Sequence, residues 1–382
     1  MLAGLYVHIP FCESKCLYCD FASGVSSQET IEVYLRALER EMAYYAADDR
    51  VKAIQFETLF IGGGTPSVLS IQQLARLLEK IHEYFHFQEQ SEWTMEANPG
   101  SLTVDKIRIA QNLGVNRFSV GVQSFDNTLL KRIGRGHTAE EARQTLYGIQ
   151  SCDVKNWNLD FIYGLPGQTL HQWSDTLQEA IKWQPSHLSL YNLIVEEGTP
   201  FGFMQDAGSL LLPSEDEQYA MMEVADALMQ KAGYEHYEIS NYAKAGFQCK
   251  HNLLYWQNRE YLGVGTSAYS FLDHHRFAHT SSVKEYIHHW QEHNSPLVSE
   301  DEFTTPDIEL TETILMGLRL MQGVSYQEVN RRFGIHFQER FREAIATGIQ
   351  RQWLEETSQG YLRLTPQAIP IGNQVSLLFL KD

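Results

Sequence analysis

Short segments typical of β-strands alternate with amphipathic segments typical of α-helices as far as residue 232. The strand-like segments are GLYVHI, FETLFIGGG, EWTMEAN, NRFSVGVQ, NWNLDFIYGLP and HLSLYNLIV. Apolar residues recur at helical spacing in the segments 28–46, 70–87, 103–113, 138–150, 169–183 and 214–232. Because a helix between two strands returns the second strand in the direction of the first, about six such units predict a parallel sheet.

The unusual residues of the chain stand where these strands end. HIPFC follows the first strand, GGGTPS the second, EANPGS the third, GVQSF the fourth and DFIYGLP the fifth, while YNL lies at the sixth. A (β/α) barrel gathers the carboxyl ends of its strands around one mouth, where such folds build their sites. We therefore predict an α/β fold in which residues 1–233 form a partial (β/α)6 barrel of the TIM type.

The regular alternation ends after about residue 233. Residues 234–303 are rich in aromatic and histidine side chains, and we predict that they form an extension packed on the barrel. From Thr304 onward, TPDIELTETILMGLRLMQGVSYQEVNRRFG is typical of helices. Residues 304–382 are therefore predicted to form a small, mainly helical domain.

Charge and cysteine content narrow the class of protein. The chain has 48 acidic side chains against 30 Lys and Arg and a formal net charge of -18, which opposes binding to nucleic acids and to anionic membranes. It lacks a basic apolar leader and any apolar run of about 18 residues, so we predict a cytoplasmic protein without a transmembrane segment. Five cysteines favour reduced thiols over a disulfide framework.

Three of these cysteines, Cys12, Cys16 and Cys19, lie in the segment CESKCLYC directly after the first strand, whereas Cys152 and Cys249 are isolated. A structural zinc ion is normally closed by four ligands in paired motifs, and the sequence has no second pair. A 4Fe-4S cluster held by three thiolates leaves one iron open to another ligand. The spacing therefore favours an iron–sulfur cluster over zinc.

The CxxxCxxC motif, with an aromatic residue before its last cysteine and GGGTPS after the second strand, resembles the radical S-adenosyl-L-methionine (SAM) superfamily. The resemblance implies a 4Fe-4S cluster with SAM on the fourth iron. The branch that includes oxygen-independent coproporphyrinogen III dehydrogenase is similar over nearly the whole chain, so residues 304–382 are identified as a HemN-like domain. Its motifs imply that SAM contacts Tyr6, Tyr18, Gly63, Gly64, Thr65, Glu96, Gln123, Arg135, Asp160 and Ile194.

The charged members of this set suit the groups of SAM. Glu96 can accept a hydrogen bond from the ammonium, Arg135 can form two hydrogen bonds with the carboxylate, and Asp160 can accept from ribose hydroxyls. Each residue alone could equally be an ordinary surface or capping charge. Their joint placement at strand ends carries the prediction.

Two departures from the dehydrogenases bear on the activity. The dehydrogenases that this chain resembles carry a further cysteine two residues after the third and an N-terminal arm over the site. This chain has Phe21 at the position of that cysteine, and eleven residues precede Cys12. The segment HNLLYW at 251–256, the CDF motif and the length instead resemble the HemW family of heme chaperones, whose HNxxYW motif is associated with heme. These features favour a heme carrier, with the coproporphyrinogen III decarboxylase as the enzymatic alternative. A tRNA-modifying protein conflicts with the acidic charge.

The HemW resemblance implies that His251 ligates heme iron, that Tyr255 and Trp256 pack against the macrocycle, and that residues 234–303 are the heme-binding extension. Without the family, a core histidine packed among aromatic rings would be favoured. Acceptor proteins are implied partners, with those of the respiratory chain as candidates. EYIHHWQEH is typical of an amphipathic helix with a solvated face, so we assign no role to the nearby imidazoles His274, His275, His279, His288, His289 and His293.

Overall fold

The structure is a computed structural model that describes residues 2–380. Its strands are β1 (Leu2–Ile9), β2 (Gln55–Gly63), β3 (Phe87–Ala97), β4 (Arg117–Gln123), β5 (Asn156–Tyr163), β6 (His187–Asn192), β7 (Glu235–Glu238), β8 (Asn241–Ala243), β9 (Tyr261–Val264), β10 (Tyr269–Leu272), β11 (His275–His279), β12 (Val298–Phe303), β13 (Val324–Ser325), β14 (Leu354–Glu356) and β15 (Tyr361–Leu364).

The helices of the first part of the chain are α1 (Gln28–Ala47), α2 (Asp49–Lys52), α3 (Ile71–Tyr84), α4 (Val104–Asn112), α5 (Asn127–Arg132), α6 (Ala139–Ser151), α7 (Leu170–Trp183), α8 (Pro200–Asp206) and α9 (Glu215–Lys231). Those that follow are α10 (Lys250–Trp256), α11 (Val283–Glu292), α12 (Pro306–Gly317), α13 (Tyr326–Phe333), α14 (Phe337–Arg340), α15 (Arg342–Gln350) and α16 (Gly372–Ser376). Short 3-10 helices span Pro66–Val68, Pro366–Ile371 and Leu377–Phe379.

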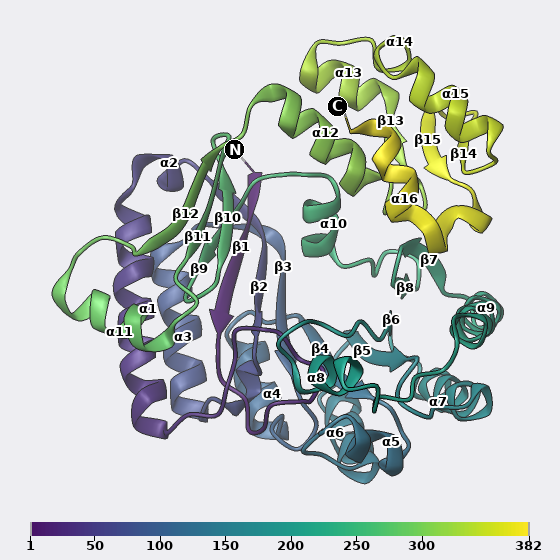
Figure 1. Cartoon of the computed structure of the whole chain (residues 1–382). Coiled ribbons are helices and arrows are strands. Elements are labelled where there is room, and N and C mark those ends of the chain that lie inside the picture. The colour runs from purple at the N-terminus through teal and green to yellow at the C-terminus, as the bar shows by residue number, and fades with distance from the viewer. Residues whose placement is uncertain (1, 381–382) are drawn as a thin grey trace.

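Strands β1 to β6 lie side by side in chain order, and every neighbouring pair among them is parallel. Helices α1, α3, α4 and α6 contact one another in that order along the outside of these strands (Figure 1). The predicted order of parallel βα units is therefore confirmed. The sequence pairs Ser70 with Gln73, Thr138 with Glu141 and Ser214 with Glu217 match capping boxes, and such boxes are present at the amino ends of α3, α6 and α9, where each fixes the start of its helix.

The two faces of the parallel sheet differ in chemistry. Leu59 and Leu159 are fully buried in the main apolar core, which includes residues of the covering helices. Thr58 and Asn158, one position earlier on the same strands, are buried polar residues. Since side chains alternate along a strand, the strands present a polar face to the inside of the partial barrel.

Residues of the predicted extension lengthen the sheet at both of its edges. Strand β9 pairs in parallel with β1, and β10, β11 and β12 follow it as antiparallel strands. At the other edge, β8 pairs antiparallel with β6 and β7 pairs with β8. Helix α10 lies in the chain between these two groups and contacts β1 and β2 (Figure 1). The segment between β6 and β9 therefore crosses the open side of the barrel.

The C-terminal helices α12 to α16 pack with a three-stranded sheet in the order β13-β15-β14. This part has its own apolar core, which includes Leu310, Phe337 and Leu362. Its contacts with the rest of the protein include the side-chain amide of Asn258, which donates to Glu309 O at 3.2 Å, and Arg332 Nη2, which donates to Asn258 O at 2.7 Å. No helix among residues 2–380 is both long and apolar enough to cross a membrane.

Candidate functional site

A cavity of about 360 Å³ opens where the carboxyl ends of β1 to β6 meet, and we call it the mouth cavity. Its walls come from the loop after β1, the glycine-rich loop after β2 and the ends of the following strands. The residues that line it include Cys12, Cys16, Tyr18, Cys19, Phe21, Gly63, Gly64, Thr65, Glu96, Asn98, Ser119, Gln123, Arg135, Asp160, Tyr191 and Ile194. The mouth cavity therefore brings together the three clustered cysteines and every residue predicted to contact SAM except Tyr6.

The three cysteines lie on the loop between β1 and α1. The backbone of this loop is fixed by Cys12 N, which donates to Gly24 O at 3.0 Å. Two of the sulfur atoms have polar neighbours from other strands: Thr65 Oγ1 lies 3.5 Å from Cys12 Sγ, and Arg135 Nη1 lies 3.5 Å from Cys16 Sγ. Donors of this kind stabilise thiolates and the sulfur ligands of a cluster.

The donor set suits a cluster better than a single ion. Among residues 2–380, no three His, Cys, Asp or Glu side chains converge closely enough to hold one metal ion. A 4Fe-4S cluster needs no such convergence, because each thiolate binds a different iron. Burial raises the pKa of the Cys19 thiol, so binding a cluster would have to displace its proton.

The glycine-rich loop is held against the cysteine loop. Gly63 has a φ of +106°, a backbone conformation that residues other than glycine rarely adopt. A Cβ atom on Gly64 would lie 2.7 Å from Phe11 O, so the two backbones approach too closely for any larger residue. Thr65 follows and accepts from Asn98 Nδ2 at 2.9 Å. The GGGTPS segment therefore needs its glycines for close backbone packing at the mouth.

Two half-buried carboxylates lie at the mouth, Glu96 on β3 and Asp160 on β5, on either side of β4. Glu96 Oε2 accepts from Gly63 N at 3.1 Å, and burial, with the negative charge of Asp160, raises the pKa of Glu96 to about 7. Asp160 accepts from Asn158 Nδ2 at 2.7 Å and from Ser119 Oγ at 3.2 Å. Burial nevertheless raises the pKa of Asp160. Both groups would gain from a cationic or hydroxyl-bearing ligand that stabilises the charged form.

Arg135 is the guanidinium of the mouth cavity. Its Nη2 donates to Asn98 Oδ1 at 2.7 Å and to Gly121 O at 2.5 Å. Its Nε is buried and has no partner among residues 2–380. A buried donor is costly to leave unpaired, so this nitrogen is an unsatisfied polar group beside the cavity.

Gln123 reaches the mouth through an irregularity of β4. The register between β4 and β5 shifts between Gly121 and Gln123, and Gln123 has a φ of 65°. A residue other than glycine in this conformation is strained, and such strain commonly occurs at functional sites. The bulge ends the pairing of β4 at the edge of the cavity.

Some lining residues were missed by the sequence predictions. Asn98, which joins Thr65 to Arg135, lies in the EANPGS segment, so its place after the third strand was a usable signal. Ser119 donates to Asp160 and follows from the alternation of polar residues along β4. Tyr191 lies near the end of β6 in the YNL segment, so its place at the sixth strand end was a usable signal.

A second cavity, of about 570 Å³, lies beside the mouth cavity and shares Phe21, Gly63 and Glu96 with it. We call it the aromatic cavity. Its other lining residues are Tyr6, His8, Ala22, Phe60, Tyr255, Trp256, Asn258, Arg259, Tyr261, Ser267, Tyr269, Arg276 and Met316. Tyr6 therefore lines this cavity and not the mouth cavity, because it lies in the middle of β1 and the mouth begins after the end of that strand.

Two guanidinium groups stand at the aromatic cavity. Arg259 Nη2 lies 2.6 Å from Glu57 Oε1, and Arg276 Nη2 lies 2.7 Å from Glu312 Oε2. Arg276 also donates from Nε to Glu312 Oε1 at 3.2 Å and from Nη2 to Asn258 Oδ1 at 2.8 Å, so its Nη1 takes no part in these contacts. Arg259 has further N–H donors beside its pair with Glu57, since arginine carries five. The cavity thus combines flat aromatic surface with donors suited to carboxylates.

The segment HNLLYW forms α10, which Glu92 of β3 caps. Glu92 Oε1 accepts from Lys250 N at 3.0 Å and from His251 N at 3.4 Å, and Cys249 Sγ lies 3.6 Å away. The carboxylate replaces the missing N-cap side chain and fixes the helix inside the barrel.

His251 is buried behind Tyr255. Its Nδ1 lies 2.7 Å from Thr58 Oγ1, its Nε2 lies 2.9 Å from Tyr255 Oη, and its ring stacks on Phe60 with centroids 5.2 Å apart. Burial, with the charge of Arg117, lowers the pKa of His251 to about 3, so the imidazole is neutral. The predicted heme residues Tyr255 and Trp256 line the aromatic cavity, whereas His251 does not. Its role as iron ligand stays a prediction.

The histidines between residues 274 and 293 line neither cavity. His288 is exposed on α11, as the amphipathic pattern predicts. His279 is buried, and its Nε2 lies 3.0 Å from Glu41 Oε1 and 3.0 Å from Tyr45 Oη. This contact joins β11 to α1 and is structural.

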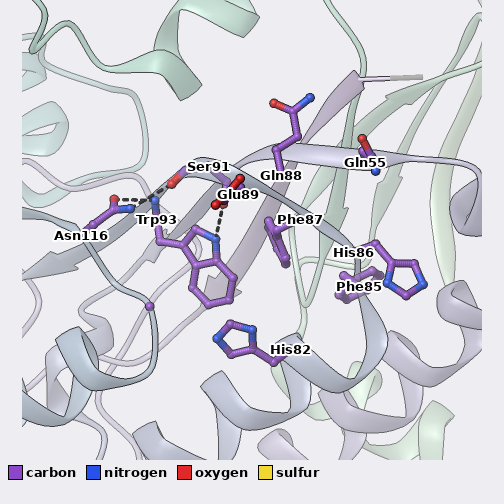
Figure 2. Close-up of a pocket in the computed structure, with 11 residues that line it drawn as sticks. Gln55, His82, Phe85, His86, Phe87, Gln88, Glu89, Ser91, Trp93 and Asn116 are labelled. Carbon is purple, nitrogen blue, oxygen red and sulfur yellow. Dashed lines mark hydrogen bonds between the residues drawn. The ribbon is translucent and has the colours of Figure 1, made fainter.

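A third cavity, of about 540 Å³, lies near the amino ends of β2 and β3, at the opposite end of the barrel (Figure 2). His82 stacks on Trp93 there with ring centroids 4.4 Å apart. Trp93 Nε1 donates to Ser91 Oγ at 3.0 Å, and Asn116 Nδ2 donates to Ser91 O at 2.9 Å. None of the predicted site residues lines this cavity.

Comparison with known proteins identifies two families in the chain. The radical SAM superfamily matches residues 6–180, and the HemN C-terminal domain matches residues 304–371. The structure resembles that of coproporphyrinogen III oxidase (HemN) from Escherichia coli, described as a radical SAM enzyme, with a TM-score of 0.84 and 23% identity over 99% of this chain and 89% of that chain. This likeness confirms the predicted fold.

Two full-length relatives are more similar in sequence. The heme chaperone HemW of Lactococcus lactis subsp. lactis is 36% identical over 377 residues, which cover 99% of this chain and 97% of the relative. The heme chaperone HemW of Bacillus subtilis is 36% identical over 378 residues, which cover 99% of both chains. From its sequence and its fold, this chain belongs to the HemW family of the radical SAM superfamily.

Proposed function

We propose that this protein is a heme chaperone, which binds heme in the aromatic cavity and passes it to acceptor proteins. One observation carries the proposal: the cavity that presents Tyr255 and Trp256 shares a wall with the cavity that gathers the three clustered cysteines. Bound heme would therefore lie next to the cofactors of the mouth cavity. The name of the full-length relatives supports the same function.

The mouth cavity suits a 4Fe-4S cluster held by Cys12, Cys16 and Cys19. When bound, such a cluster offers an iron with one coordination position open to SAM. Thr65 and Arg135 would donate to the sulfur ligands, as they do to the thiols in this structure. The protein groups thus support the cluster beyond the three thiolates.

Three charged residues around the cluster suit the functional groups of SAM. Glu96 would accept from the ammonium group, and Asp160 would accept from the ribose hydroxyls. Arg135, which lines the mouth cavity, would donate to the carboxylate. The glycines Gly63 and Gly64 leave the backbone open to the ligand.

The aromatic cavity suits heme by size and by chemistry. Its volume of about 570 Å³ lies in the range of cavities that bury small ligands. Trp256, Tyr261 and Tyr269 offer flat apolar surface to a macrocycle, while Arg259 and Arg276 could donate to its propionates. The proposal places the transfer in the cytoplasm, where reduced thiols persist, with proteins of the respiratory chain as candidate acceptors.

A transfer experiment tests this function against the enzymatic alternative. The protein is reconstituted anaerobically with its cluster, loaded with one equivalent of heme, and mixed with an apo b-type cytochrome. We expect the cytochrome spectrum to appear. A parallel sample receives coproporphyrinogen III, SAM and an electron donor, and we expect no protoporphyrinogen IX. Rapid turnover without heme transfer would instead assign the protein as an oxygen-independent coproporphyrinogen III dehydrogenase.

Two variants of exposed tyrosines test whether heme binds in the aromatic cavity. Tyr269 lines the aromatic cavity and is 51% exposed, so Tyr269→Ala should leave the fold intact. Loss of one aromatic contact, about 1 kcal/mol, should weaken heme binding about fivefold. Tyr147→Ala is the control, because Tyr147 is 64% exposed on α6 and lines neither cavity. Equal heme affinities for both variants would place heme elsewhere.

A further inference from the structure

We propose that Tyr255 provides the protein ligand to the heme iron through its phenol oxygen, and that His251 is a positioning residue that orients this oxygen. The inference rests on the proposed heme binding and changes the assignment of the iron ligand. The resemblance of the HNLLYW segment to the HemW motif favours His251, and imidazole is a common ligand of heme iron. Phenol oxygen is also an established ligand of heme iron in proteins.

The placement of the two rings carries the inference. Tyr255 lines the aromatic cavity, whereas His251 is 1% exposed and does not line it. The rings meet edge to face with centroids 4.9 Å apart. Any iron bound in the cavity would therefore meet the Tyr255 side chain before the imidazole.

The surroundings of His251 fix it in this position. Both ring nitrogens are already in hydrogen bonds, to Thr58 and to Tyr255. Phe60 stacks on one face of the ring. A Cβ atom on Gly4 would lie 3.1 Å from His251 Cε1, so β1 passes directly against the ring. Moving the imidazole into the cavity would break two buried hydrogen bonds, whereas Tyr255 needs no such movement.

The hydrogen bond between the two residues suits metal binding by the tyrosine. A neutral imidazole with its proton on Nδ1 donates to Thr58 Oγ1 and accepts the Tyr255 hydroxyl on Nε2. To bind ferric iron, the Tyr255 hydroxyl would give its proton to His251 Nε2, 2.9 Å away, and the oxygen would bind as phenolate. An acceptor behind a ligand orients it and increases its basicity, which is the usual function of a neighbour to a metal ligand.

The aromatic cavity holds one competing pair of the same kind. Tyr6 Oη lies 3.0 Å from His8 Nδ1, and both side chains line the cavity. His8 Nε2 lies 3.2 Å from Ala22 O, so both of its nitrogens are occupied as well. The HNLLYW segment, which the resemblance links to heme, contains only the Tyr255 pair. Tyr6→Phe is therefore the matched control for the loss of a hydroxyl bonded to histidine.

The experiment titrates ferric heme into the full-length, cluster-loaded protein and its variants and records visible and electron paramagnetic resonance spectra. We expect Tyr255→Phe to weaken binding at least tenfold and to change both spectra, and Tyr6→Phe and Tyr261→Phe to retain the wild-type spectra. His251→Gln keeps a hydrogen-bond acceptor for Tyr255. This variant should bind heme about tenfold more weakly and retain the spectral features of the wild-type protein.

A second measurement needs no variant. Resonance Raman spectra of wild-type protein with ring-deuterated tyrosine should show an isotope-sensitive iron–oxygen vibration. If Tyr255→Phe retained the wild-type spectra and His251→Gln lost them, His251 would be the ligand. That result would overturn this proposal and leave the proposed heme binding unaffected. Spectral change in Tyr6→Phe alone would move the ligand to Tyr6 and also overturn it. Failure of the wild-type protein to bind heme would refute the proposed function itself.

Discussion

Replacing Glu96 by glutamine should stabilise the protein and weaken its binding of SAM at the same time. Burial and the charge of Asp160 raise the pKa of Glu96 from its ordinary 4.5 to about 7. Between these two values, the native state holds a proton that the unfolded state has released. The native state therefore loses stability as the pH rises from 4.5 to 7.

The size of this loss follows from the two pKa values. The pKa of Glu96 differs by about 2.5 between the native and unfolded states. One pKa unit is about 1.36 kcal/mol, so the loss of stability is about 3 kcal/mol. Glutamine has no charge to bury, and its side-chain oxygen can still accept from Gly63 N. Glu96→Gln should therefore raise the free energy of unfolding of the SAM-free protein at pH 8 by about 3 kcal/mol and flatten its dependence on pH.

The same change should cost affinity for SAM, because the ammonium group would lose its carboxylate partner. A hydrogen bond to a charged group contributes about 1.5–3 kcal/mol, so the dissociation constant should rise about 10- to 100-fold. Urea unfolding at pH 5.5 and pH 8 measures the free energy of unfolding, and anaerobic calorimetric titration measures the dissociation constant for SAM. Glu89→Gln is the control, since Glu89 is exposed on the same strand. A Glu96→Gln protein that is less stable at pH 8, or that binds SAM as tightly as wild type, would refute the reasoning.

Other variants test the cysteine loop and the wall between the cavities. Cys16→Ser should abolish the absorbance of the reconstituted cluster, while Cys249→Ser, at the start of α10, should retain it; stoichiometric zinc after anaerobic purification would contradict both. Gly64→Ala should lower the stability by about 1–3 kcal/mol in urea and reduce the iron content, whereas Gly24→Ala should change neither, because its Cβ would meet no atom within 4 Å. Phe21→Ala should leave the urea midpoint nearly unchanged, because Phe21 is 63% exposed, but should weaken heme binding in titration; unchanged binding would remove Phe21 from the heme site.

The sequence was sufficient to predict the fold and the residues that meet at the mouth. Strand-like segments alternating with helices specify parallel strands, and parallel strands end at the same side of the sheet. Residues as distant as Cys12, Glu96 and Asp160 could therefore be placed together from their positions at strand ends. The capping boxes were also readable, because both partners lie within one turn of helix.

The sequence did not reveal how residues 234–303 are arranged. They were predicted to pack on the barrel, but their strands join both edges of one sheet. Which edge a short strand joins depends on the free backbone groups of β1 and β6, which lie far away in the chain. The strand pattern alone carries no information on that partner.

The resemblance to known families placed Tyr6 with the SAM residues and His251 at the heme iron, whereas tertiary packing decided where both side chains lie. Tyr6 faces the aromatic cavity because its strand runs past the mouth before it ends. His251 is enclosed because Thr58 and Phe60, nearly 200 residues earlier in the chain, occupy its surroundings. A motif fixes the order of residues along a helix, but the neighbouring strands decide which of them reaches the cavity, because each buried polar atom must find its partner there.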